Sequence, residues 1–434
     1  MDKIYIRFCL LALLPLVGFS QSKRPQVLVY GSGVDAYAAA MQSSMSNLNT
    51  VWVVDSDKIT PELTSEAISI ESNVNLDAGI WADFLAKVLR HDQRSDSISA
   101  IAKRKITPQI AQNVIDDAVR EAKNLTIIKG AQALTVKKSG KNWQIQLTNR
   151  QRFKVRAVVD ASADAVLHQL AYGKTDSIST RTLLSADYFQ SEVYDQLSRT
   201  GVAVGDLGGK PFTLPLAALV PADDSNLFLT RKTPVVQPFL DGTAETIPLL
   251  MHVGQAIGAA AAYTAFFKTT SDKLDARNVQ GELLQYGARL MPFGDVPIES
   301  PHFASIQRIG ATGVLQTTTS MPGGHARFDP DSPVVAWEIQ PVLNQLFSRS
   351  QIWFVDHAEV DTLTLANLFS YIKFVGQRGD ELEGQVQKYW NKRFHFTDEY
   401  DEQMIVTRRH VAVLLDTYCK PFEVKVGLDG TIQR

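Results

Sequence analysis

Short apolar runs alternate with segments of helical periodicity over most of the chain. Strands are expected at residues 26–30 and 50–54, where apolar residues run without interruption into glycine or aspartate. Residues 107–123 place apolar residues three and four apart, which predicts an amphipathic helix, and the apolar run NLTIIKG follows directly. Strands that alternate with helices predict an α/β, Rossmann-like fold around a mostly parallel sheet.

The pattern changes twice further along. ALTVKK and WQIQL predict two short strands, and VRAVVDAS predicts another buried one, whereas residues 165–212 are weakly patterned. PLLMHVGQAIGAAAAYTAFF predicts a helix whose small residues permit close packing. Beyond it the chain becomes helical and richer in charge. We therefore place a boundary near residue 290, between an α/β domain at residues 21–290 and a small helical domain at residues 291–434.

The first 20 residues have the pattern of a secretory signal peptide. Lys3 and Arg7 precede the apolar run FCLLALL, and Gly18-Phe19-Ser20 supplies small residues at a cleavage site. The run is short for a membrane span, so cleavage before Gln21 is expected rather than retention as an anchor. The mature chain is expected to be periplasmic or secreted, and no later stretch is expected to cross a membrane.

Composition narrows the classes of ligand. The formal net charge is −2 and there is no basic stripe, so no nucleic acid is expected as a partner. Cleavage removes Cys9 and leaves Cys419 as the only cysteine, which excludes an internal disulfide and a cysteine-based metal site. The histidines lack metal-ligand spacing, so no metal site is expected.

The segment VLVYGSGVDAYAAAM carries the strongest candidate site. Gly31 would make a tight turn, Gly33 would let backbone N–H groups approach a pyrophosphate, and Ala36 is an accepted variant at the third glycine position. Asp55, at the end of the next strand, would accept hydrogen bonds from ribose hydroxyls. Asp35 opposes this interpretation, because a carboxylate in the first helical turn repels a phosphate that it faces. A dinucleotide site and a βα turn without a ligand both remain open.

Several segments in order resemble the FAD-dependent oxidoreductases that bind their cofactor at a glycine-rich loop, particularly an exported bacterial branch. They include TPQIAQNVIDDAVREAKNLTIIKGAQALTV, FKVRAVVDASADAVLHQLAYG and DGTAETIPLLMHVGQAIGAAAAY. The resemblance covers about residues 25–270 and implies FAD and hydride transfer. It implies that the backbone of Ala133 lies beside the adenine and that Asp160-Ala161-Ser162 ends a strand that packs next to the dinucleotide. It also implies that Gly254 and Gln255 open the last helix, whose N-terminal N–H groups would face the flavin. The implied cofactor-binding residues are Gly31, Ser32, Gly33, Ala36, Asp55, Ala133, Asp160, Ala161, Ser162, Gly254 and Gln255.

The chain also departs from that family. Arg231 stands where the family usually has glycine before a basic residue, and Glu245 stands where it usually has arginine. The interval between Asp160 and Pro211 is too short for the usual substrate domain. Two functions therefore stay open. One is an exported FAD-dependent oxidoreductase acting on an unknown small molecule, with catalytic residues unknown. The other is a non-catalytic binding or scaffold protein that keeps the flavoprotein fold.

The tail resembles an S-layer-homology module in PFGDVPIESPHFASIQRIGATGVLQ and ARFDPDSPVVAWEIQPVL. VTRRHVAVLLDTY, at Val406–Tyr418, resembles the second helix of another copy, which predicts a degenerate internal repeat. In other proteins such modules bind wall-attached polysaccharide, so the resemblance implies cell-envelope polysaccharide as a partner. A small helical domain packed on the first domain explains the same pattern.

Overall fold

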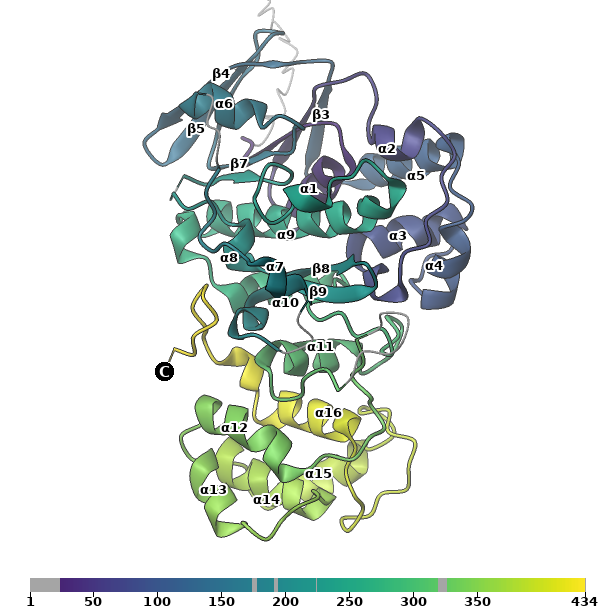
Figure 1. Cartoon of the computed structure of the whole chain (residues 1–434), viewed down its shortest axis with the longest axis vertical. Helices are drawn as coiled ribbons and strands as arrows, with labels where there is room; N and C mark the ends of the chain where they lie inside the picture. Colours follow the sequence, from purple (N-terminus) through teal and green to yellow (C-terminus); the bar gives the residue numbers. More distant parts are fainter. Residues whose placement is uncertain (1–23, 174–177, 191–193, 224, 319–325, 434) are drawn as a thin grey trace, which may run out of the picture.

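The structure is a computed structural model that describes residues 24–173, 178–190, 194–223, 225–318 and 326–433. The predicted signal peptide lies outside the described residues, and its cleavage stays a prediction. Figure 1 shows the α/β part at one end of an elongated molecule and a group of helices at the other.

A five-stranded parallel sheet forms the centre of the α/β part, in the order β10-β7-β1-β2-β3. Val27 pairs with Thr50 on one side and with Ala157 on the other. Both faces of a parallel sheet are covered, which is why these strands are almost continuously apolar. The strands are β1 (Val27–Tyr30), β2 (Thr50–Val54), β3 (Leu125–Lys129), β7 (Ala157–Asp160) and β10 (Leu227–Leu229).

Alternate residues of β1 enter separate cores on the two faces of this sheet. Val27 and Val29 pack in the core that contains helices α1 and α9. Leu28 and Tyr30 pack in the core shared with the antiparallel sheet β4-β5-β6. The predicted α/β Rossmann-like fold class is therefore confirmed. The covering elements are α1 (Val34–Met45), α2 (Pro61–Thr64), α3 (Gly79–Val88), α4 (Asp96–Ala102), α5 (Pro108–Glu121), α6 (Val166–Tyr172), α9 (Ile247–Phe266), β4 (Ala133–Ser139), β5 (Asn142–Leu147) and β6 (Arg152–Val155).

Helix α9 passes through the middle of the α/β part. By length and composition residues 244–266 could cross a membrane, contrary to the expectation from the sequence, but 89% of the apolar window is buried inside the protein. Gly254 and Gly258 let its backbone approach Asp35 and Ala39 of α1. The apolar character of α9 is therefore that of a core helix.

The weakly patterned region after β7 contains an antiparallel hairpin of β8 (Gly201–Leu207) and β9 (Lys210–Pro215). Its turn residues, Gly208 and Gly209, have φ of +60° and +85°, which favour glycine in a two-residue hairpin. The hairpin packs on α9 and takes the place where a substrate domain was expected. Its neighbours are α7 (Ala186–Gln190), α8 (Leu216–Leu219) and α10 (Ala276–Gln285).

The C-terminal part contains three successive helix–loop–helix units. The segments before the second helix of each unit are linked by backbone hydrogen bonds. Ahead of each second helix, the N–H of Val334 donates to the carbonyl of Val406 (3.3 Å), Val406 donates to Leu363 (3.0 Å), and Leu363 donates to Val334 (3.0 Å). These bonds close a triangle, which we call the C-terminal ring. The pairs are α11 (Phe303–Thr312) with α12 (Ala336–Leu346), α13 (Ser350–Asp356) with α14 (Leu365–Gly376), and α15 (Glu381–Tyr389) with α16 (Arg408–Tyr418).

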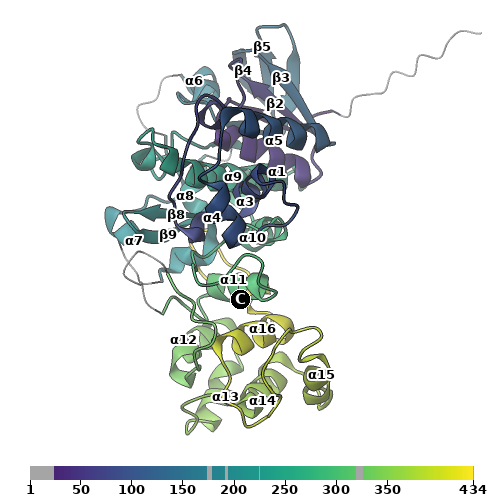
Figure 2. The same ribbon diagram turned by 90° about the vertical axis from the view of Figure 1, so that its right-hand side faces the viewer.

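Three further backbone hydrogen bonds link the same three segments in the opposite order, with one common spacing. The N–H groups two residues further on donate to carbonyls two residues earlier: Ala336 to Asp361 (2.7 Å), Leu365 to Met404 (2.9 Å) and Arg408 to Ser332 (2.8 Å). The backbone therefore contains a threefold internal repeat, although likeness to an S-layer-homology module stays a prediction. Figure 2 shows α12 to α16 grouped at the end of the molecule away from the sheet.

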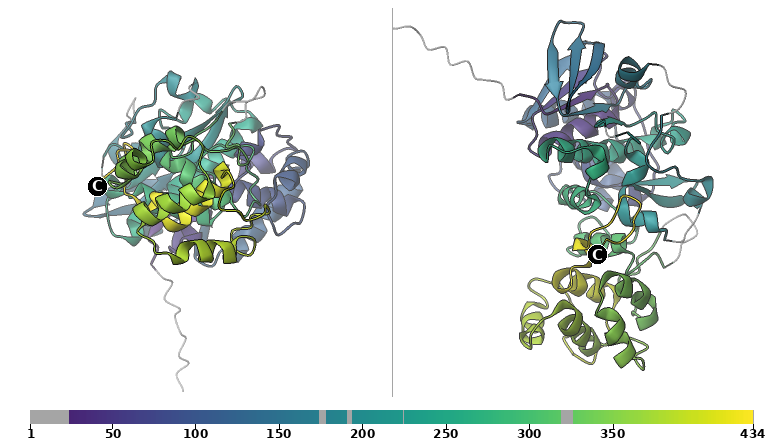
Figure 3. Two further views of the ribbon diagram at one scale, coloured as in Figure 1. Left: turned by 90° about the horizontal axis from the view of Figure 1, so that it is seen from below. Right: turned by 90° about the vertical axis from the view of Figure 1, so that its left-hand side faces the viewer.

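The two parts of the molecule share one apolar core across the predicted boundary near residue 290, and the position of that boundary stays a prediction. The chain end also returns to the α/β part, where Arg199 and Gln196 donate to the carbonyls of Gly430 and Asp429. Figure 3 shows this last segment running back beside α11.

Candidate functional site

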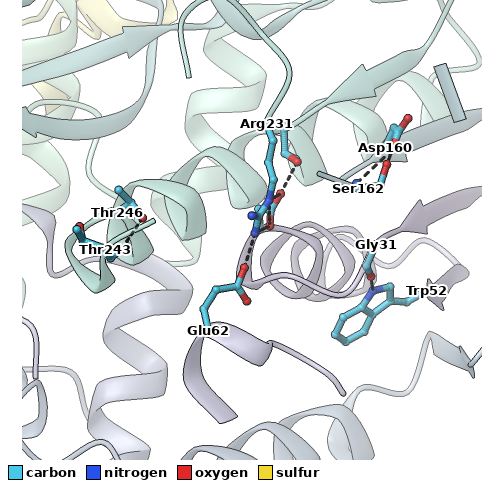
Figure 4. Close-up of polar contacts among 10 residues, drawn as sticks. Gly31, Trp52, Glu62, Asp160, Ser162, Arg231, Thr243 and Thr246 are labelled. Atoms are coloured by element: carbon cyan, nitrogen blue, oxygen red, sulfur yellow. Dashed lines mark hydrogen bonds and ion pairs between the residues drawn. The ribbon is translucent and has the colours of Figure 1, made fainter. Parts of the chain in front are cut away.

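The glycine loop Gly31–Gly33 connects β1 to α1, as the sequence predicted. Gly31 has φ of +132°, and a Cβ there would lie 2.6 Å from the backbone carbon of Ala161. Its N–H donates to the carbonyl of Val53 (3.0 Å), and its carbonyl accepts from Trp52 Nε1 (2.8 Å; Figure 4). Gly31 is therefore required by close packing against the neighbouring strand ends.

The carboxylate of Asp35 lies at the start of α1, the end of a helix that attracts anions. Asp35 is completely buried, and its carboxylate accepts hydrogen bonds from the Thr230 hydroxyl and from Arg231 Nε (3.0 Å) and Nη2 (2.6 Å). Arg231 Nη2 also pairs with Glu62 Oε1 at 2.5 Å, as Figure 4 shows. We call Asp35, Arg231 and Glu62 the ion cluster.

The ion cluster fills the space directly over Gly33. A Cβ added to Gly33 would collide with Arg231 Nη2 and come within 2.9 Å of Glu62 Oε1. Burial by itself lowers the pKa of Arg231, but the charges of Asp35 and Glu62 outweigh burial and raise it above its ordinary value. The cluster therefore holds its arginine as a cation with two anionic partners.

The remaining predicted residues of the loop and of β2 have mixed roles. The Ser32 carbonyl accepts from the N–H of Thr60 (2.7 Å), and Ala36 is fully buried against the core. One carboxylate oxygen of Asp55 is buried and has no hydrogen-bond partner among the described residues. Asp55 therefore has an unused hydrogen-bond acceptor just after β2, at the place expected for a ribose.

The backbone N–H of Ala133, expected beside the adenine, already has a partner. It donates to the hydroxyl of Tyr30 at 3.5 Å, and the Tyr30 ring is buried at the end of β1. Burial raises the pKa of Tyr30 to about 12, so the hydroxyl stays protonated near neutral pH.

Asp160, Ala161 and Ser162 end β7 and hold the turn into α6. The Asp160 carboxylate accepts from the Ser162 hydroxyl (2.6 Å; Figure 4) and from the N–H of His168 (2.9 Å). Burial raises the pKa of Asp160 to about 6, and these hydrogen bonds oppose the rise. Both carboxylate oxygens are used within the protein, which is a structural role.

The expectation that Gly254 and Gln255 open the last helix is wrong. Helix α9 begins at Ile247, and Figure 4 shows Thr243 and Thr246 at its start. Gly254 lies in the helix interior, where a Cβ would come within 2.8 Å of the Asp35 Cα. Gln255 donates to Gln42 Oε1 (2.9 Å) and accepts from the N–H of Ile80 (3.1 Å). Both residues serve helix packing.

At the start of α9 there is a separate cavity of about 370 Å³ beside the hairpin. It has apolar walls that include Leu249 and Phe239, and no lysine or arginine is among its described lining residues. Glu245, the departure noted in the sequence, lies here and accepts from the N–H of Glu71 (2.9 Å). The acidic lining residues are Glu71, Asp206, Asp241 and Glu245.

A model of the FAD-dependent oxidoreductase family matches residues 26–176 and 191–283, more than half of the sequence. The chain belongs to this family. A search of curated proteins finds no match.

Two solved structures are similar to part of the chain. Bacillithiol disulfide reductase Bdr (YpdA) from Staphylococcus aureus is 14% identical, with 38% of this chain and 43% of that chain covered and a TM-score of 0.24. Thioredoxin reductase from T. acidophilum is 15% identical, with 32% and 36% covered and a TM-score of 0.22. The chain spans less than half the length of either structure.

FAD is the cofactor of the family, and the described residues do not fit its pyrophosphate. Arg231 and its carboxylate partners fill the position over Gly33 where the family's glycine loop would receive the phosphates. The separate cavity at the start of α9 has four acidic residues among its described lining residues. Among the described residues no group of three or more His, Cys, Asp or Glu side chains could hold a metal ion.

Sequence reasoning missed the ion cluster, although it noted two of its members. Asp35 was noted as a carboxylate that would repel a phosphate, and Arg231 was noted because the family usually has glycine at its position. Their opposite charges were the available signal. Glu62 and Thr230 carried no signal, because only the fold brings them to the start of α1.

Proposed function

We propose that this chain is a non-catalytic binding protein that keeps the frame of the FAD-dependent oxidoreductase family. The observation that carries the proposal is the ion cluster over Gly33. A phosphate could enter only by displacing Arg231 from a fully buried carboxylate. Breaking a buried ion pair costs about 3–5 kcal/mol, which the bound phosphate would have to repay.

The reduced region after β7 supports the same proposal. A flavin enzyme needs a cavity that places a reacting carbon against the flavin ring. Here the described residues of that region include the hairpin β8-β9 and short helices, and the neighbouring cavity has four acidic lining residues. Neither feature favours an anionic dinucleotide.

An activity assay tests the absence of catalysis. Purified protein supplied with FAD should neither oxidise NADH or NADPH nor reduce dye acceptors above the rate of free FAD. Turnover that rises in proportion to protein concentration would overturn the proposal.

We further propose that the mature chain is exported to the periplasm or beyond the cell and binds cell-envelope polysaccharide. The predicted signal peptide supports export, and the threefold ring supports the resemblance to S-layer-homology modules. Trp337, at the start of α12, is 70% exposed and lies next to the bridge between Val335 and Thr362. An exposed indole offers an apolar face with a polar edge, which suits the face of a sugar ring.

Co-sedimentation of the full chain with isolated envelope polysaccharide tests this partner. Trp337→Ala should weaken binding several-fold without changing thermal stability. Phe266→Ala is the matched control, because Phe266 is 63% exposed but lies at the end of α9. Equal binding by wild type and Trp337→Ala would show that Trp337 does not contact the polysaccharide. If wild type does not co-sediment, polysaccharide is not the partner.

The second candidate is an exported FAD-dependent oxidoreductase that transfers hydride to or from an unknown small molecule. The partnerless oxygen of Asp55 favours it, since a carboxylate at the end of β2 can accept hydrogen bonds from ribose. Asp55→Asn should lower FAD affinity if this candidate is right and should leave all properties unchanged if it is wrong.

A further inference from the structure

We infer that the Asp35 carboxylate, with Arg231 and Glu62, is a built-in replacement for the phosphate that a glycine loop of this fold binds. This inference rests on the proposed non-catalytic function and adds a structural role for the ion cluster. The chain carries its own anion at the start of α1, so its strand ends are held together without a cofactor.

The first argument is the position of the carboxylate. The N–H groups at the start of a helix and the helix dipole together attract an anion. Asp35 places one there within the first turn of α1, completely shielded from solvent. Its donors Thr230 and Arg231 follow β10, so they come from a different strand than the one that leads into the glycine loop.

The second argument is that the cluster links segments that follow three different strands of the parallel sheet. Asp35 follows β1, Glu62 follows β2, and Arg231 follows β10. A dinucleotide in an open α/β sheet likewise lies across the carboxyl ends of several strands. Arg231 bridges Asp35 and Glu62 at 2.6 and 2.5 Å, which supplies the same cross-link from within the chain.

The third argument is backbone strain in the segment that brings Glu62 into place. Thr60 has φ of +48°, which is rare for a β-branched residue, and it is fully buried. Its N–H donates to the carbonyl of Ser32 in the glycine loop at 2.7 Å. The segment is therefore held against the loop in an unfavourable conformation, at the point where the ion cluster closes.

Binding of inorganic pyrophosphate and ADP to full-length variants tests the inference. Asp35→Ala with Glu62→Gln removes the internal anions and leaves Arg231 over Gly33. This double variant should bind pyrophosphate at least about tenfold more tightly than wild type, the gain expected for one charge-assisted hydrogen bond. Adding Arg231→Ala should abolish the gain. A folded double variant that binds no better than wild type would overturn the inference.

A second measurement applies even if the double variant does not fold. Arg231→Met leaves two facing carboxylates, whereas Arg231→Met with Asp35→Asn and Glu62→Gln leaves none. The neutral triple variant should have a folding equilibrium constant at least about tenfold larger than Arg231→Met alone. Equal stabilities would overturn the inference. Bound FAD in wild type would instead overturn the proposed function, so the two failures are distinguishable.

Discussion

The glycine loop and the C-terminal ring have diverged in opposite ways. The loop keeps the residues of a binding motif, Gly31, Gly33 and Ala36, while side chains from elsewhere fill the space over it. The ring keeps a regular threefold backbone, while its three copies share little sequence. The loop shows that a motif can be present while its binding site is filled. The ring shows that a repeated backbone can persist when its sequence repeat is weak.

The largest expected effect is at the ion cluster. Arg231→Met should lower the free energy of unfolding by about 3–5 kcal/mol, because Asp35 would be left buried without its cation. Chemical denaturation measures this. Arg120→Met is the control, since Arg120 and Asp117 form an exposed pair, and its effect should stay below about 1 kcal/mol. Similar decreases in the free energy of unfolding for both variants would show that the ion cluster contributes no more than an exposed ion pair.

The next effect concerns pH at the hairpin. His252 on α9 is buried with Nδ1 at 3.0 Å from the Val204 carbonyl, and burial lowers its pKa to about 4. Below about pH 6.5 the imidazole of His252 is protonated in the unfolded chain. In the folded chain it stays neutral down to about pH 4. Stability should therefore fall by about 3 kcal/mol as the pH drops through this window.

Comparison with His252→Gln at each pH isolates that histidine. Asp160, whose pKa burial raises to about 6, contributes with the opposite sign between about pH 4 and 6, and it does so equally in both proteins. Parallel pH profiles for wild type and His252→Gln would contradict the assignment.

Substitution of Gly254 tests whether this glycine is needed for the packing of α9 on α1. Gly254→Ala should destabilise by about 1–3 kcal/mol, because its Cβ would meet the backbone of Asp35. Gly281→Ala in α10 has nothing within 4 Å of its Cβ and should stabilise by about 0.5–1 kcal/mol through helix propensity. Thermal unfolding of both variants checks the opposite signs.

The smallest effect tests the equivalence of the ring copies. Thr364 caps α14 and Thr407 caps α16, each in a capping box, whereas Val335 precedes α12 without a side-chain cap. Thr364→Ala should cost about 1 kcal/mol, and Val335→Thr, with Glu338 three residues later, should gain somewhat less. If Val335→Thr destabilises, the first copy differs from the others in more than sequence.

Apolar periodicity predicted the central strands and the amphipathic helix α5 (Pro108–Glu121) almost residue for residue, because burial on both sheet faces requires continuous apolar runs. The hairpin β8-β9 was missed because glycines interrupt its alternation. The start of α9 was misplaced because Gly254 was taken as a helix opening rather than a packing contact.

At the candidate site, the sequence predicted the loop and the place of Asp55, but not what lies over the loop. The ion cluster joins residues up to 196 positions apart, a separation that no local pattern can encode. The sequence predicted the C-terminal ring only in part for the same reason. The ring consists of single backbone hydrogen bonds between distant segments.

The most direct test of the central claim is titration of wild-type protein with FAD. Protein expressed with flavin in excess should lose all yellow colour on gel filtration. Calorimetric titration should then give no saturable heat, corresponding to a Kd weaker than about 1 mM, or about 4 kcal/mol of binding free energy. One FAD per chain that survives gel filtration would contradict the account, because the flavin's phosphates would then have displaced Arg231 from Asp35.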